Sequence, residues 1–185
     1  RALFEAIRAE LGELPLVAEN LGEITPAVER LRHELKLPGM AVMQFAFNPE
    51  EPDSPYKLER HEEEDVVYTG THDHDTARGW YEEQGEESRA EFERELARVR
   101  IEEEEPWWAL IRLTMSSRCR TCMVQIQDVL GLGSEARMNT PGTVGPQNWS
   151  WRLAEGALTP ELARRLRDAT AAADRVRGFA GSADG

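Results

Sequence analysis

Apolar residues along this chain follow two patterns, a helical spacing and a series of short continuous runs. Over residues 1–12 they recur every three or four positions, which predicts a helix that ends at Gly12. Residues 14–18 (LPLVA) and 40–47 (MAVMQFAF) are instead almost uninterrupted apolar runs. Such runs are typical of strands covered on both faces in a parallel sheet, so each of them predicts a strand.

Helix starts are marked by Thr-Pro pairs. Thr25-Pro26 and Thr159-Pro160 place a capping hydroxyl before a proline at the first helical position, and a glutamate follows within the first turn of each. These pairs predict helices that run from Thr25 to near Pro38 and from Thr159 to about Ala172. The remaining patterns predict strands over residues 66–69 and 122–129, and helices over residues 76–84, 86–101 and 106–115.

The predicted order alternates strands with helices, which indicates an α/β fold with parallel pairing and right-handed crossovers. An open doubly wound sheet and part of a (β/α)₈ barrel both fit this order. A complete barrel has eight strands, so four predicted strands correspond to about half of one. We expect residues 1–176 to form one domain, and residues 177–185, which are small and polar, to form a flexible tail.

Composition excludes several classes of protein. The 185 residues include 22 Lys and Arg against 35 Asp and Glu, a net charge of −13, which argues against binding to nucleic acid or to an anionic membrane surface. No apolar run approaches the length of a membrane-spanning helix. Cys119 and Cys122 are the only cysteines, so we expect reduced thiols and, by default, a cytoplasmic location.

Polar residues follow each predicted strand. They are Glu19, Gln44, the run from His72 to Asp75, and Gln127-Asp128 with Asn139 beyond. Ligands of parallel α/β folds bind at the carboxyl ends of the strands, so we expect these side chains to converge on one rim. Glu19 follows five uncharged residues. It is either a helix cap or ion-pair partner, or a partly desolvated carboxyl group whose raised pKa suits a general acid.

The run His72-Asp73-His74-Asp75 has three interpretations. His and Asp are good ligands for zinc or iron, but adjacent residues point in different directions and no third His stands at a familiar ligand spacing, so no metal is expected. Asp75 and Thr76 could instead cap the next helix. In the third interpretation His72 and Asp73 face a substrate.

Seven motifs, in order, carry a resemblance to a known family. They are LVAENLGEITP (16–26), LPGM (37–40), VMQFAF (42–47), VYTGTHDHD (67–75), QDVLGLG (127–133), ARMNTPG (136–142) and NWSWR (148–152). Together they resemble the amylomaltases, bacterial 4-α-glucanotransferases of the α-amylase-like (β/α)₈ group. The resemblance spans about residues 1–170.

The resemblance implies a retaining transfer of α-1,4-glucan segments to an acceptor sugar, without a cofactor. The family's general acid/base corresponds to Glu19, and its transition-state-stabilising aspartate corresponds to Asp73. The neighbouring His72 is expected to contact the same sugar, and Asn139 to line the sugar subsites. Among the rim residues, Gln44 and Asp75 are further candidates for substrate binding.

The sequence departs from the family pattern at Asn20 and His74, where the family usually has Asp and Asn. Neither replaces a catalytic group, so we expect both to tune neighbouring hydrogen bonds.

The family's nucleophile, an Asp in an Arg-x-Asp segment after the fourth barrel strand, has no match in this sequence. The resemblance therefore implies the C-terminal half of the barrel, about strands 5–8, with the N-terminal half as its missing partner. Alone, such a half should associate with itself and should lack transfer activity. Two alternative functions are a related α-glucan hydrolase and a non-catalytic glucan-binding remnant. A metal-dependent hydrolase is a more remote alternative.

Overall fold

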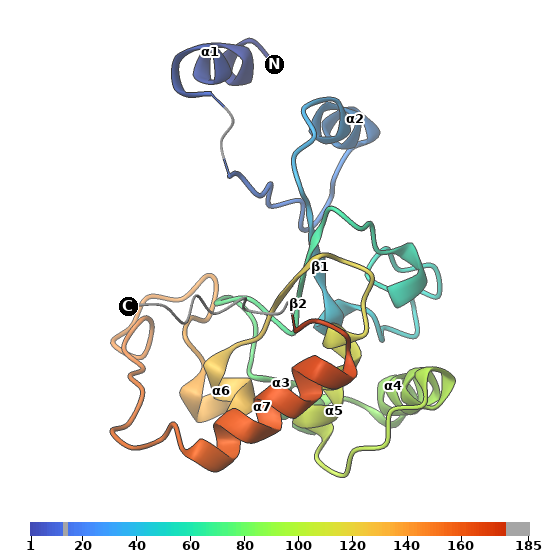
Figure 1. Cartoon of the computed structure of the whole chain (residues 1–185), viewed down its shortest axis with the longest axis vertical. Helices are drawn as coiled ribbons and strands as arrows, with labels where there is room; N and C mark the ends of the chain where they lie inside the picture. Colours follow the sequence, from blue (N-terminus) through green and yellow to red (C-terminus); the bar gives the residue numbers. More distant parts are fainter. Residues whose placement is uncertain (13–14, 177–185) are drawn as a thin grey trace, which may run out of the picture.

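The structure, a computed structural model, describes residues 1–12 and 15–176 (Figure 1). The helices are α1 (Ala2–Leu11), α2 (Pro26–Glu34), α3 (Ala77–Glu83), α4 (Glu86–Val99), α5 (Pro106–Met115), α6 (Ile126–Val129) and α7 (Pro160–Ala172). The strands are β1 (Met40–Val42), β2 (Val66–Tyr68) and β3 (Thr121–Met123), and short 3₁₀ turns lie at Met43–Phe45, Leu58–Arg60 and Ser134–Ala136. The predicted tail over residues 177–185 lies outside the described residues.

The three strands form one parallel sheet in the order β1-β2-β3. In the register, Ala41 pairs with Val67, which pairs in turn with Cys122. The predicted α/β fold with parallel pairing is therefore confirmed. All six predicted helices begin within one residue of their expected positions, because the signals that start them are local. Thr25 and Thr159, for example, accept hydrogen bonds from Val28 N–H and Leu162 N–H.

The prediction of a strand over residues 14–18 is wrong for those of its residues that the structure describes. Leu14 lies outside them, and residues 15–18 have no regular secondary structure. Leu16 and Val17 are exposed, so this apolar run is not covered as a central strand would be. The Ala18 N–H donates to the Pro38 carbonyl (2.7 Å), which ties the segment to the chain just before β1.

Two other predicted strands extend too far. The run over residues 40–47 leaves the sheet after Val42 and continues as a 3₁₀ turn, and the run over residues 122–129 ends at Met123 and continues as α6. In both places the apolar side chains beyond the strand are still buried, as Met43 and Val129 show. A short apolar run does not distinguish a buried strand from a buried helical turn, so the periodicity could not locate these ends.

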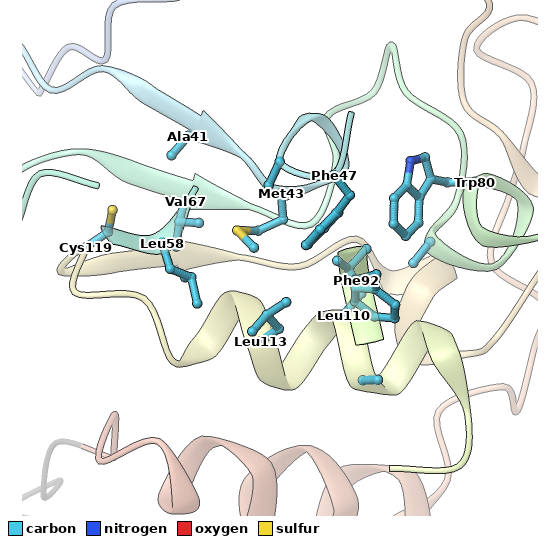
Figure 2. Close-up of a cluster of buried hydrophobic side chains, with 13 residues drawn as sticks. Ala41, Met43, Phe47, Leu58, Val67, Trp80, Phe92, Leu110, Leu113 and Cys119 are labelled. Atoms are coloured by element: carbon cyan, nitrogen blue, oxygen red, sulfur yellow. The ribbon is translucent and has the colours of Figure 1, made fainter. Parts of the chain in front are cut away.

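Helices α3, α4 and α5 cover one face of the sheet. Ala41 and Val67 point to that face and join a buried cluster with Phe92 of α4 and Leu110 and Leu113 of α5 (Figure 2). Successive side chains of a strand point to opposite faces, so the residues flanking these two in each strand point away from the helices. On β3 the corresponding residue, Met123, is half exposed.

A second cluster joins α5 to α6 and α7. Trp108 and Ile111 of α5 pack with Val129 of α6 and with Leu162 and Leu166 of α7. The Trp108 ring is almost fully buried, and the Arg165 guanidinium of α7 lies 4.2 Å from its centroid. Three of the five tryptophans pack in or against the two clusters: Trp80 and Trp108 are buried, and Trp107 is partly buried.

The N-terminal helices stand apart from this core. Figure 1 shows α1 well away from the sheet, and none of its residues is buried. It contacts the end of α2 through an ion pair between Arg1 and Glu34 and through a hydrogen bond from Arg8 to the Leu35 carbonyl. None of the helices in the described part of the chain is long and apolar enough to cross a membrane.

Candidate functional site

The loop that follows β2 carries the run from His72 to Asp75, and a helix cap ends it. Thr76 precedes α3, and its hydroxyl accepts a hydrogen bond from the Gly79 N–H at 3.1 Å. The capping interpretation of the sequence is thus confirmed for Thr76. Because the cap fixes where α3 begins, it fixes one end of the loop that presents His72 and Asp73.

Asp73 is held from two sides. Its carboxylate accepts a hydrogen bond of 2.6 Å from the Asn139 side-chain amide, and its backbone carbonyl accepts one of 2.7 Å from the Arg137 guanidinium. Arg137 also donates to the Asn139 carbonyl. The carboxylate remains 42% exposed, so it is oriented by the protein and still open to a ligand.

The two histidines beside Asp73 have different surroundings. His72 Nε2 lies 3.3 Å from the Asp73 carboxylate, and its ring lies against the exposed Trp149 with centroids 5.1 Å apart. His74 instead turns inward, where its Nδ1 accepts from the Thr71 N–H (3.0 Å) and its ring meets Phe45 edge-on. Burial lowers the pKa of the His74 imidazole, so this ring is neutral near neutral pH.

Glu19 and Asp73 line the same open cleft, which has a volume of about 320 Å³. It lies on the sheet face opposite the helices, and its other lining residues are Leu21, Met40, Tyr68, Gly70, Thr71, His72, His74, Met123, Val124 and Gln125. The structure therefore brings both predicted catalytic carboxyl groups to one place. The expected desolvated pocket around Glu19 is not formed by the described residues, because Glu19 is exposed there.

Glu19 is placed by its neighbour rather than by a strand. The Asn20 side-chain oxygen accepts a hydrogen bond of 2.7 Å from the Met40 N–H at the start of β1. Behind it, the buried Arg32 pairs with Asp65 (2.9 Å) and with Glu29, and its hydrogen bond lowers the pKa of Glu29. A side-chain hydrogen bond between Asn20 and Glu29 links this network to the segment that carries Glu19.

Gln44 and Asp75, the other predicted substrate-binding residues, are buried and do not line the cleft. The Gln44 amide donates to the Asp75 carbonyl at 2.9 Å. The Asp75 carboxylate accepts from the Thr76 N–H and the Ser134 hydroxyl, each at 2.7 Å. Both side chains hold the loop from beneath. Gln44 also borders a second hollow, of about 550 Å³, beside Phe45.

Sequence reasoning missed the role of Asp128. Its carboxylate has no exposed surface and accepts from the Thr69 hydroxyl (2.6 Å) and the Ala77 N–H (2.7 Å). Burial raises the pKa of Asp128 to about 6. Thr69 and Ala77 lie 59 and 51 residues away from Asp128 in the chain, so no local pattern could indicate these contacts. The only signal in the sequence was the position of Asp128 in the rim set that follows the predicted strands.

Gln125 is a further lining residue that no pattern indicated. Its side-chain nitrogen is buried without a hydrogen-bond partner within the described residues. It lies close to Gly70, where an added Cβ would be 3.0 Å from this nitrogen and 2.7 Å from the Gln44 amide nitrogen. Gly70 thus leaves room for two amide side chains at the end of β2.

The metal interpretation of the run from His72 to Asp75 receives no support from the described residues, and the two cysteines are not paired with each other. Across residues 1–12 and 15–176, no group of three or more His, Cys, Asp or Glu side chains is arranged to hold a metal ion. Cys119 and Cys122 are free thiols, and burial raises the pKa of Cys122 to about 11. A thiol of that pKa is protonated and unreactive at neutral pH.

Residues 1–159 match the family model described as 4-alpha-glucanotransferase. The 4-alpha-glucanotransferase of Thermus thermophilus is 49% identical over 179 residues, which cover 94% of this chain and 35% of that protein. The chloroplastic/amyloplastic 4-alpha-glucanotransferase of Solanum tuberosum is 42% identical, over 95% of this chain and 30% of that protein.

A solved structure gives the same result. The amylomaltase from Streptococcus agalactiae in complex with acarbose superposes with a TM-score of 0.86 at 33% sequence identity, over 95% of this chain and 35% of that one. This chain thus spans about a third of the length of the relatives it matches.

Proposed function

The chain belongs to the 4-alpha-glucanotransferase family, and on that premise we propose that it forms part of the catalytic barrel of such an enzyme. The reaction is the transfer of an α-1,4-glucan segment from a donor to the hydroxyl of an acceptor sugar. Its substrates are maltooligosaccharides or longer α-1,4-glucans. The step needs no redox or group-carrying cofactor, because one glycosidic bond replaces another. The cytoplasmic location expected from the sequence remains part of this proposal.

The observation that carries the proposal is the cleft shared by Glu19 and Asp73. Glu19 is the general acid/base: it protonates the leaving glycosidic oxygen and then takes a proton from the acceptor hydroxyl. It needs freedom to exchange protons with sugars, and its exposure in the cleft allows this. The two residues come from segments far apart in the sequence, and the fold alone brings them together.

Asp73 stabilises the positively charged transition state and binds sugar hydroxyls. The amide donor from Asn139 fixes the direction of the Asp73 carboxylate. His72 lies at hydrogen-bond distance on the other side and can share a sugar hydroxyl with Asp73. Asn139 lies at the same subsite. Gln44 and Asp75 support the loop that carries Asp73 and do not contact the sugar directly.

The barrel assignment is supported by the one-sided cover of the sheet. Helices α3, α4 and α5 pack against the face that carries Ala41 and Val67, whereas the open cleft lies on the other face, beside Tyr68 and Met123. In a (β/α)₈ barrel the helices lie outside and the second face lines the barrel interior. A doubly wound sheet would carry helices on both faces. We therefore assign residues 1–176 to part of a barrel. The resemblance of the motifs is our reason for proposing its C-terminal half, about strands 5–8.

The family's nucleophile has no counterpart among these residues, so the test supplies it from a relative. In a chimera, this chain replaces the aligned segment of the Thermus thermophilus 4-alpha-glucanotransferase, and maltotriose is the substrate. We expect glucose together with longer maltooligosaccharides. Glu19→Gln and Asp73→Asn should each lower the rate by about 10²–10⁴-fold. Glu82→Gln, an exposed change on α3, should not alter it.

Each result of this assay has a defined meaning. Glucose and maltose without longer products would indicate a hydrolase. Binding of maltotriose without turnover, in a chimera that folds, would indicate a glucan-binding remnant. Full activity in the Glu19→Gln chimera would contradict the assignment of the acid/base. The chain alone is expected to release no glucose, because no covalent intermediate can form without a nucleophile.

A further inference from the structure

One buried carboxylate binds both ends of the loop between β2 and α3. Asp128, at α6, accepts from the Thr69 hydroxyl at the end of β2 and from the Ala77 N–H at the start of α3 (2.6 and 2.7 Å). The seven residues 70–76 lie between these two contacts. Asp128 therefore fixes both ends of the segment whose middle carries His72 and Asp73.

A second contact ties the same loop to the same support. The Asp75 carboxylate accepts from the Ser134 hydroxyl at 2.7 Å, and Ser134 begins the 3₁₀ turn that follows α6. Gly79 allows this contact, because a Cβ there would lie 2.3 Å from the Ser134 oxygen and 2.7 Å from the Asp75 carboxylate. The segment from α6 to Ser134 thus contacts the loop through Asp128 at both of its ends and through Ser134 at Asp75.

Stability alone gives no reason for a carboxylate at this position. Asp128 has no exposed surface, and the groups that shift its pKa are Ala77, Thr69 and Asp75, with no Lys, Arg or His of the described residues among them. Burying an unpaired charge costs free energy, and apolar side chains of similar volume are often as stable or more stable in such places. A carboxylate does supply two fixed acceptors, however, and two donors from different elements converge on it.

We propose that Asp128 is a positioning residue for Asp73. It acts by holding the Thr69 and Ala77 ends of the loop at a fixed separation, so that the Asp73 carboxylate stays in line with the Asn139 amide and faces the cleft. The sugar-binding part of this role rests on the proposed function. The positioning part concerns the geometry of Asp73 and Asn139 alone and can be measured without a substrate.

The test uses the full 185-residue chain and four variants. Asp128→Asn keeps the size of the side chain but replaces one acceptor with a donor. Thr69→Val removes the hydroxyl at the other end of the contact, and Thr69→Ser retains it. Thr114→Val is the matched control, because Thr114 is equally buried but its hydroxyl bonds to the Leu110 carbonyl within α5. Calorimetry establishes that each variant is folded at the working temperature.

Two readouts separate positioning from folding. The first is the NMR signal of the Asn139 side-chain amide, assigned with Asn139→Ala, which reports its 2.6 Å bond to Asp73. The second is the affinity for acarbose. We expect Asp128→Asn and Thr69→Val to move the amide signal toward that of a solvent-bonded amide and to weaken acarbose binding about tenfold. Thr69→Ser and Thr114→Val should leave both unchanged.

The outcomes are distinguishable. An unchanged Asn139 signal in folded Asp128→Asn and Thr69→Val chains would overturn the positioning role. So would an equal change in Thr114→Val, since the effect would then report general loss of stability. A wild-type chain that binds no acarbose would contradict the proposed function, while the NMR signal would still decide whether Asp128 orients Asp73.

Discussion

Asp128 should give this protein an unusual dependence of stability on pH. Burial raises its pKa from 3.8 to about 6, even though the Thr69 hydroxyl and the Ala77 N–H favour the charged form. The folded state therefore binds a proton more tightly at this site than the unfolded state does. The stabilising contribution is complete below pH 3.8, where both states are protonated, and is lost as the pH rises through about 6.

The magnitude follows from the shift. One pKa unit corresponds to about 1.4 kcal/mol, so a rise of about two units corresponds to about 3 kcal/mol. The unfolding free energy of the wild type also contains contributions from the other Asp and Glu residues of the chain, so the effect of Asp128 has to be isolated by comparison with a variant. Asp128→Asn removes only the one titrating group. The difference in unfolding free energy, wild type minus Asp128→Asn, should therefore fall by about 3 kcal/mol between pH 3.5 and pH 7.

Urea unfolding followed by tryptophan fluorescence measures this difference. Five tryptophans, two of them buried in the core, give a strong signal on unfolding. Thr69→Val provides an internal check, since removing a donor to the carboxylate should raise the pKa of Asp128 further and move the transition to higher pH. A difference that stays flat, or that rises with pH, would refute the reasoning. In that case the hydrogen bonds from Thr69 and Ala77 would fully offset the effect of burial on the pKa of Asp128, and its carboxyl group would be charged in the folded state.

Three other changes test the packing around the site. Trp108→Ala should destabilise the chain by about 3–5 kcal/mol, because it empties the centre of the second cluster, and an effect below 1 kcal/mol in urea unfolding would contradict that placement. Gly79→Ala should lower the melting temperature even though alanine is the better helix former, since its Cβ meets the Ser134 hydroxyl; a rise would show that the hydroxyl moves freely. Thr159→Ala should cost about 1 kcal/mol through loss of the α7 cap, and Thr159→Ser should restore it.

The helices were predictable because their signals are local. A capping hydroxyl, a proline and the first apolar turn lie within a few residues of each other, so Thr25 and Thr159 mark the starts of α2 and α7 without reference to the rest of the chain. Parallel pairing was predictable from the alternation of strands and helices. The lengths of the strands were not, because burial continues past Val42 and Met123 after the backbone has left the sheet.

The site was predictable only in part. The motifs pointed to Glu19 and Asp73, and both line the cleft. They did not distinguish a residue that faces the cleft from one that supports it. Asp73 and Asp75 lie two positions apart in one motif, yet the first is open to solvent and the second is buried against Ser134. Nothing in their spacing determines which is which.

By itself, then, the sequence determined the positions of the helices other than α6, the α/β class and, through seven ordered motifs, the family. The tertiary structure alone decided which polar groups meet: Asn139 with Asp73 across 66 residues, and Asp128 with Thr69 across 59. Local order follows from backbone geometry and from hydrogen bonds within a few residues. The environment of a carboxyl group instead depends on burial and on donors from distant elements, and these exist only once the chain has packed.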